Sequence, residues 1–316
     1  MPIASAPLVK PTSQQQRWAG LKRVTAVVMG AVTIAISLLP PPAIAGDPFR
    51  ASDSRNIDSQ TEAAFKAIFE QGNYREAAQL LDTAQTDEPL AYAMKASIAY
   101  LNGDNEGLGR NGTLTREAAQ RLTQSDPLRG HIYTAAGHFL EGAHTLTTQG
   151  TVRATPAVLG KLQQVFNELG EAEKIAPNDP ELNLIKGFMD LMLAVNLPFS
   201  NPQQAIERLQ NYAAPDYLAQ RGIAIGYRDL EQPDLALQAV ERAIQAAPNN
   251  PDLLYLKAQI LVLQNRPQES LRLFRQALAQ REQLPDGLGD QIAYEQCRAN
   301  NRVNNRRQNC NRLLQD

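Results

Sequence analysis

A recurrence at a spacing of 34 residues constrains the fold of this chain more than any other feature of its sequence. Small and apolar residues return at this spacing in three pairs, namely Ala236 and Ser270, Val240 and Phe274, and Ala243 and Ala277. The segment Pro248-Asn249-Asn250-Pro251 closes the first unit and echoes Pro177-Asn178-Asp179-Pro180, which lies 71 residues earlier. Periods of this length indicate a stacked array, in which each unit buries its apolar face only against its neighbours.

The units of the array are expected to be helical. Leu237, Val240, Ile244 and Ala247 place one apolar stripe on a helix face. A capping side chain followed by proline marks several helix starts, namely Asp126-Pro127, Thr155-Pro156, Asp179-Pro180, Asn201-Pro202 and Asn250-Pro251. We therefore expect an all-α fold of stacked antiparallel helical hairpins, with about fourteen helices and short turns. An irregular helical bundle is the alternative.

The repeat resembles the tetratricopeptide repeat, a helix–turn–helix unit with small residues at fixed packing positions. In the unit at 217–250, the family's small, aromatic and terminator positions hold Ala224, Tyr227, Ala236 and Pro248. The next unit matches at Ala258, Leu261, Ser270, Phe274 and Ala277. The tryptophan of the family's first helix is replaced by Thr61, Gln220 and Leu254, so these units are diverged.

The resemblance divides the chain into regions. It implies a tetratricopeptide-like helical domain over 58–283, with clear units in 58–103 and 156–283. The stretch 102–157 is diverged, and Asn111-Gly112 within it indicates a loop. Residues 46–57 precede the domain as an N-terminal extension. Residues 284–316, polar and rich in asparagine, are expected to form a C-terminal helical cap, because the end of a stacked array needs a polar outer face.

The first 45 residues have the composition of a secretory signal peptide. They hold four basic side chains and no acidic one, with an uncharged run over 24–39 and then Ala43-Ile44-Ala45. That run makes a helix of roughly 24 Å, short for a bilayer core of about 30 Å. We expect cleavage between Ala45 and Gly46 and a soluble, exported product; an uncleaved segment that anchors the chain in the membrane is the alternative. The chain looks similar to exported repeat proteins of photosynthetic bacteria, so both the periplasm and the thylakoid lumen are open as destinations.

The charge of the chain argues against nucleic acid as a partner. The whole chain has 31 basic and 33 acidic side chains. Removal of the four basic ones in 1–45 leaves 27 against 33, a net charge of −6. A mildly acidic surface of mixed sign does not suit phosphate binding. Five C-terminal arginines could contact an anionic lipid surface or an acidic partner, or form an ordinary solvated face: Arg298, Arg302, Arg306, Arg307 and Arg312.

The two cysteines, Cys297 and Cys310, favour a disulfide in an exported chain. Closing a loop of about 14 residues stabilises a fold by roughly 3 kcal/mol in the chain-entropy model. Two free thiols that never meet are the alternative.

The sequence carries no recognisable catalytic or cofactor motif, since neither Gly-x-Ser-x-Gly nor a phosphate-binding loop occurs. His131, His138 and His144 fall in one expected helix together with Glu141. His131 and His138 lie about 10.5 Å apart along the helix axis, whereas zinc needs nitrogens about 2.0–2.1 Å away. We therefore expect no enzyme, no cofactor and no metal; a metal-dependent enzyme that uses this helix is the alternative.

The resemblance implies a function in protein–protein or peptide interaction. In such arrays the first helix of each unit lines a concave groove. The groove positions carried over from the family are Arg221, Ile225, Arg228, Tyr255, Gln259 and Val262. Two arginines near a tyrosine could hold a carboxylate or an acidic segment, or be merely exposed. We expect an exported scaffold that binds protein or peptide partners, with an assembly factor attached to a membrane surface as the alternative.

Overall fold

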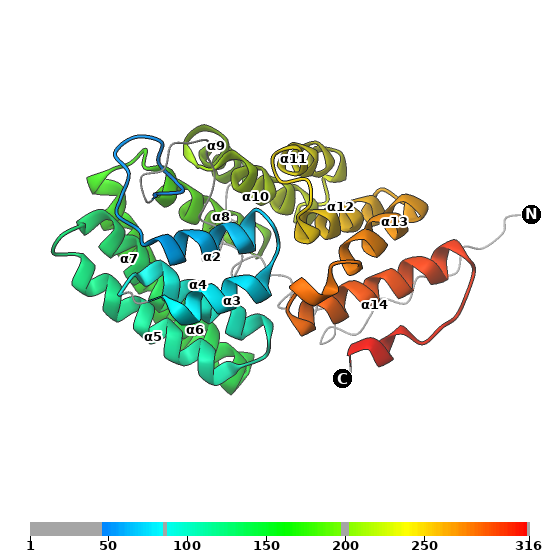
Figure 1. Cartoon of the computed structure of the whole chain (residues 1–316), viewed down its shortest axis with the longest axis horizontal. Helices are drawn as coiled ribbons and strands as arrows, with labels where there is room; N and C mark the ends of the chain where they lie inside the picture. The colour runs from blue at the N-terminus through cyan, green and yellow to red at the C-terminus, as the bar shows by residue number, and fades with distance from the viewer. Residues whose placement is uncertain (1–45, 85–86, 197–201, 315–316) are drawn as a thin grey trace, which may run out of the picture.

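The computed structural model describes residues 46–84, 87–196 and 202–314 (Figure 1). These residues form thirteen α-helices, two short 3-10 helices and no strand, which confirms the expected all-α fold of stacked hairpins. The predicted cleavage residue Ala45 lies outside the described residues. The elements in chain order are α2 (Ser59–Phe69), α3 (Tyr74–Thr83), α4 (Pro89–Leu101), α5 (Asn105–Leu122), α6 (Pro127–Gln149), α7 (Thr151–Ile175), α8 (Pro180–Asn196), α9 (Pro202–Tyr212), α10 (Asp216–Asp229), α11 (Pro233–Ala246), α12 (Pro251–Leu263), α13 (Pro267–Leu278), η1 (Arg281–Gln283), α14 (Asp286–Val303) and η2 (Cys310–Leu314).

Helices begin where a side-chain oxygen can accept from the unpaired N–H groups of the first turn. At the start of α6, Asp126 accepts from the amide of Arg129 at 3.2 Å. At the start of α12, Asn250 accepts from the amide of Asp252 at 2.9 Å. The proline after each cap has no backbone N–H, but that N–H would have no partner in the first turn of a helix, so no hydrogen bond is lost. The predicted start at Thr155-Pro156 is wrong, because α7 begins at Thr151 and holds that proline inside the helix.

The diverged stretch contains long helices that pack closely, and Asn111-Gly112 is inside α5 rather than in a loop. A Cβ on Gly112 would lie 3.0 Å from the Cβ of Leu140 on α6. A Cβ on Gly137 of α6 would lie 2.6 Å from the backbone nitrogen of Arg116 on α5. Both glycines therefore allow close approach of two helices, which explains why the Asn-Gly pair does not form a turn.

Consecutive helices pair as hairpins, with α2 on α3, α4 on α5, α8 on α9, α10 on α11 and α12 on α13. α10 also packs on α8 and α9, so the hairpins stack into one continuous array. α14 packs along α13 and reaches α4 (Figure 1). Within the described residues, every helix is too short or too polar to span a lipid bilayer.

The array closes on itself, because its first hairpin meets its last units (Figure 1). Asn250 Nδ2 donates to the carbonyl of Phe69 at 2.7 Å, across 181 residues of chain. Gly72 has a φ of +68°, and a Cβ there would lie 2.4 Å from Pro251 Cδ. A residue with a side chain would be strained and would clash, so glycine permits the contact. We call this junction between the α2–α3 turn and the start of α12 the seam.

A buried ion cluster ties the N-terminal extension to the start of α8. Arg50 donates to both carboxylate oxygens of Asp179 at 2.8 Å and to Glu181 at 2.9 Å. Asp47 accepts a further bond from Arg50 at 2.7 Å. All four side chains are buried. The extension is thus fixed in place by charge-assisted bonds rather than lying free.

The cluster continues through a second arginine on α6. Arg129, 2% exposed, donates to the two oxygens of Glu88 at 2.7 and 3.2 Å. Its Nε lies 3.3 Å from Glu181, which also accepts from the hydroxyl of Tyr133. Burial raises the pKa of Glu181, although the positive charges of Arg129 and Arg50 oppose this shift.

Candidate partner-binding site

The six predicted groove residues lie on two helices that contact each other. α10 carries Arg221, Ile225 and Arg228, and α12 carries Tyr255, Gln259 and Val262. Ile225 is buried and the other five are half-buried. The residues are therefore brought together as predicted, but other parts of the same chain cover much of their surface.

A chain of hydrogen bonds joins α10 and α12 to α14. Arg228 Nη1 donates to Gln259 Oε1 at 2.7 Å, which leaves the Nε2 of that amide to donate to both carboxylate oxygens of Glu295 at 3.2 Å. The hydroxyl of Tyr255 donates to Glu295 at 2.8 Å, and Gln291, one turn earlier on α14, donates at 2.9 Å. Arg228 thus orients one of the three donor groups that hold this carboxylate.

The electrostatics of this set keep it suited to an anion. Burial favours the neutral form of Arg228, but Asp229, Tyr255 and Glu295 outweigh burial and raise its pKa, so the side chain stays charged. Asp229 is the nearest of these, accepting from Arg228 Nε at 2.8 Å. Burial and then Glu295 raise the pKa of Tyr255 well above its usual value. Its hydroxyl is therefore a hydrogen-bond donor at neutral pH.

The second arginine of the predicted groove faces the seam. Arg221 Nη2 lies 3.6 Å from Asp252 Oδ2, the oxygen that also accepts from the hydroxyl of Tyr74. Burial raises the pKa of Asp252, against the opposing effects of Arg221 and Tyr74. Arg221 and Arg228 thus meet different carboxylates, those of Asp252 and Asp229.

Sequence reasoning found the donors on α10 and α12 but missed Gln291, Tyr74 and both carboxylate acceptors. Glu295 lies 36 residues from Gln259, and Asp252 lies 178 residues from Tyr74. No local pattern marks such distant partners. Tyr255 and Gln259 hold a carboxylate that the chain itself supplies from α14, and Arg228 acts on it only through Gln259.

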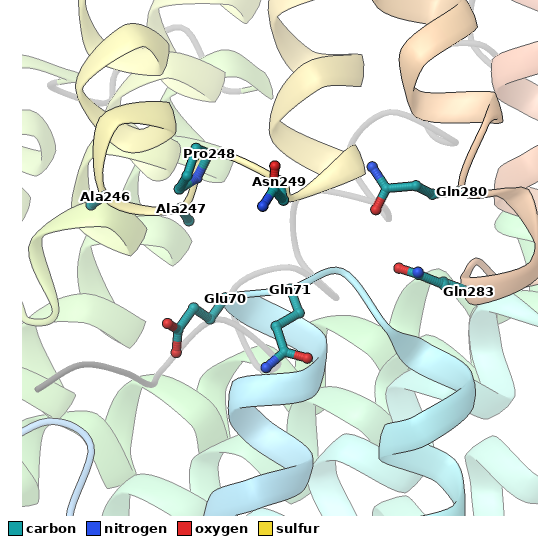
Figure 2. Close-up of a pocket in the computed structure, with 8 residues that line it drawn as sticks. All are labelled: Glu70, Gln71, Ala246, Ala247, Pro248, Asn249, Gln280 and Gln283. Carbon is teal, nitrogen blue, oxygen red and sulfur yellow. The ribbon is translucent and has the colours of Figure 1, made fainter.

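A small pocket lies at the seam, where the end of α2 faces the turns before α12 and α14 (Figure 2). Its volume is about 270 Å³, just below the roughly 300–1,000 Å³ of small-molecule sites. The side chains of Gln280 and Gln283 extend toward the gap in Figure 2, and burial raises the pKa of Glu70 at its edge. The full lining is Glu70, Gln71, Ala246, Ala247, Pro248, Asn249, Gln280 and Gln283.

The three histidines of α6 meet separate partners. His131 Nδ1 lies 2.7 Å from Glu168, and His138 Nδ1 lies 3.5 Å from Glu141. His144 lies against Gly109 of α5. Nowhere in the described part of the chain do three or more His, Cys, Asp or Glu side chains form a group that could hold a metal ion.

Glu141 instead joins α6 to both of its neighbours. It accepts from Arg116 of α5 at 2.9 Å and from Lys161 of α7 at 2.5 Å. Burial opposes the charged form, but hydrogen bonds from His138, Lys161 and Arg116 outweigh it and lower the pKa of Glu141 far below its usual value. This carboxylate therefore has a structural role among three helices.

The C-terminal cap contains the predicted disulfide. Cys297 of α14 is bonded to Cys310 of η2, with the two Cα atoms 5.7 Å apart. The disulfide prediction is confirmed. The arginines around it are all exposed, namely Arg298, Arg302, Arg306, Arg307 and Arg312.

Residues 221–285 match the tetratricopeptide repeat family. The matched segment runs from α10 to the end of the turn before α14 and contains all six groove residues. No curated protein and no solved structure matches the chain.

The matched segment has buried small residues at the positions where the tetratricopeptide repeat has them. Its small positions leave no side-chain surface exposed, because two helices meet over each of them. These positions are Ala224, Ala236, Ala258, Ser270 and Ala277. The match begins at residue 221, so the resemblance over 58–103 and 156–220 stays a prediction.

Proposed function

We propose that this chain is an exported, non-enzymatic scaffold that binds a protein or peptide partner through the face formed by α10 and α12. Tetratricopeptide repeats generally serve protein–protein interaction, and the matched segment contains this face. One observation carries the proposal. The face already holds a helix of its own chain, α14, by the carboxylate of Glu295. A partner with an acidic side chain or a C-terminal carboxylate offers the same chemistry.

Export is supported by the composition of the first 45 residues and by the Cys297–Cys310 disulfide, which an oxidising compartment favours. The periplasm and the thylakoid lumen both meet this condition.

Site-specific photo-cross-linking in cells tests the proposed face. A photoreactive amino acid at Leu263, which is 49% exposed and one turn beyond Gln259 on α12, should form an adduct with a partner protein. The substitution Gln259→Glu should abolish the adduct, because it replaces a donor by a second carboxylate beside Glu295. The same probe at Leu159 on α7, which is 59% exposed, is the matched control.

The proposal fails if Leu263 gives no adduct, or if the adducts from Leu263 and Leu159 are the same and survive Gln259→Glu. Either result would mean that the α10–α12 face does not select the partner.

A membrane-surface assembly factor is the second candidate, favoured by the exposed arginines of the cap. The protein should then float with vesicles that contain an anionic phospholipid but not with vesicles of phosphatidylcholine alone. Replacement of Arg306 and Arg307 by glutamine should remove that binding. Flotation that ignores lipid charge would exclude this candidate.

A further inference from the structure

The N-terminal extension is held so firmly that the position of its first described residue is set. Arg50 anchors it in the buried ion cluster, as described above. Phe49 is 4% exposed and packs on Phe65 of α2, with ring centroids 6.4 Å apart. Asp47 accepts from the backbone amides of Phe49 and Arg55, both at 2.9 Å. Three kinds of contact thus fix the four residues that follow Gly46.

Gly46 in turn lies beside a carboxylate in the first turn of α2. The backbone nitrogen of Gly46 donates to Glu62 Oε2 at 3.1 Å. The other oxygen, Oε1, accepts from Lys66 one turn later at 2.5 Å. The side chain of Glu62 is 21% exposed, so water screens the contact only in part.

We propose that hydrolysis of the Ala45–Gly46 peptide bond creates an α-ammonium group on Gly46 that forms an ion pair with Glu62 and fastens the extension to α2. Water supplies the hydroxyl that completes the carboxyl group of Ala45 and the hydrogen that completes the amine of Gly46. The amine then takes up a proton, so a neutral N–H donor becomes a cation at the same place. The peptidase that supplies the cleavage is of the class that removes secretory signal peptides.

The proposal rests on the export part of the proposed function and adds a consequence that export alone does not require. A chain that kept residues before Gly46 would have a neutral amide beside Glu62, and a chain cut further on would lack the contact. Cleavage at this one bond therefore makes the contact a charge-assisted pair.

The first experiment is the intact mass of the exported protein after expression of the full chain, 1–316, in a secreting bacterium. The expected product starts at Gly46. A product that starts at any other residue overturns the proposal, because no charged amine then faces Glu62.

The second experiment isolates the charge of the amine by a double-mutant cycle on chains that start at Gly46. One chain has a free amine and the other is acetylated at Gly46, which keeps an N–H donor and removes the charge. The free amine should raise the unfolding midpoint by about 1–4 °C. The substitution Glu62→Gln should abolish that difference, whereas Glu106→Gln, at an exposed glutamate in the first turn of α5, should leave it unchanged.

A third measurement does not depend on stability. At pH 7 the amine of the Gly46 chain should react several-fold more slowly with an amine-reactive reagent than the amine of the Glu62→Gln chain, because the carboxylate favours the unreactive ammonium form. Equal rates, or a stability difference that survives Glu62→Gln, would overturn the ion pair. Neither result would affect the adduct at Leu263, so failure of this proposal is distinguishable from failure of the partner-binding face.

Discussion

The substitution Arg129→Met tests how strongly the buried ion cluster holds α4, α6 and α8 together. The arginine is 2% exposed, makes two hydrogen bonds to Glu88 and lies 3.3 Å from Glu181. Methionine fills a similar volume but leaves both carboxylates without this cation. Removing one partner of a buried pair typically destabilises a protein by about 3–5 kcal/mol. At about 2–4 °C per kcal/mol, the unfolding midpoint should fall by about 6–20 °C.

Thermal unfolding followed by circular dichroism measures this loss, with Arg121→Met as the control. Arg121 pairs with Asp87 at 3.0 Å, but its side chain is 59% exposed and that of Asp87 is 82% exposed. An exposed pair of this kind contributes at most about 1 kcal/mol. Equal losses in the two variants would refute the reasoning, because burial is the difference on which the prediction depends.

The pH dependence of Arg129→Met gives a second check on the same cluster. Burial already raises the pKa of Glu181 above 4.5, and loss of Arg129 removes one of the charges that oppose this shift. A carboxyl group whose folded-state pKa is raised contributes stability that is present below pH 4.5 and lost as pH rises through the folded-state pKa. The deficit of Arg129→Met should therefore shrink on acidification, and Glu181→Gln should restore part of it at neutral pH.

Three further outcomes follow from single contacts. Because the pKa of Glu141 is lowered, its charged form contributes stability above pH 4.5 that is lost as pH falls. In Glu141→Gln the free energy of unfolding should therefore fall less steeply as the solution is acidified. Gly72→Ala should lower the unfolding midpoint more than Gly103→Ala. Both glycines have a positive φ, of 68° and 73°, but of the two only Gly72 is packed against another part of the chain, at the seam. Reduction of Cys297–Cys310 should destabilise the cap by up to about 3 kcal/mol and speed proteolysis after α14.

A specific result would contradict each of these three predictions. An unchanged acid profile in Glu141→Gln would mean that the hydrogen bonds from His138, Lys161 and Arg116 contribute no net stability. Equal effects of the two glycine substitutions would mean that the seam does not depend on Gly72. Proteolysis at the same rate before and after reduction would mean that packing alone holds η2 on α14.

The helices of this chain could be predicted because their signals are local. A cap such as Asp126 and the proline after it satisfy or remove donors within one turn, so a few residues decide where a helix starts. The same locality explains the errors. Gly112 follows an asparagine, and an Asn-Gly pair often forms a turn. Here the missing side chain of Gly112 instead allows α5 and α6 to pack closely. Distinguishing these two uses of glycine requires knowledge of which helices meet.

Closure of the array could not be predicted for a related reason. The bonds that form the seam join residues such as Asn250 and Phe69 across 181 positions, and those of the ion cluster join Arg50 to Asp179 across 129. Each unit looks complete with respect to its neighbours, because stacking is a nearest-neighbour interaction. Whether the two ends of the stack meet depends on the small rotation of every unit along it.

Several neighbours of the candidate site also lie far from it in the sequence, so its state could not be predicted. Arg221 and Arg228 indicate a site for an anion when α10 and α12 are considered alone. Once their neighbours are counted, Arg221 lies near the distant carboxylate of Asp252 and Arg228 pairs with the adjacent Asp229, so both charges are already matched within the chain. A partner must therefore replace the contact of α14 with this face rather than fill an empty site. Its net free energy of binding equals the free energy of its own contact minus that of the α14 contact. Glu295→Gln, which removes the competing carboxylate and keeps the helix, should then increase the yield of the Leu263 adduct. A decrease would show that α14 forms part of the binding surface instead of competing for it.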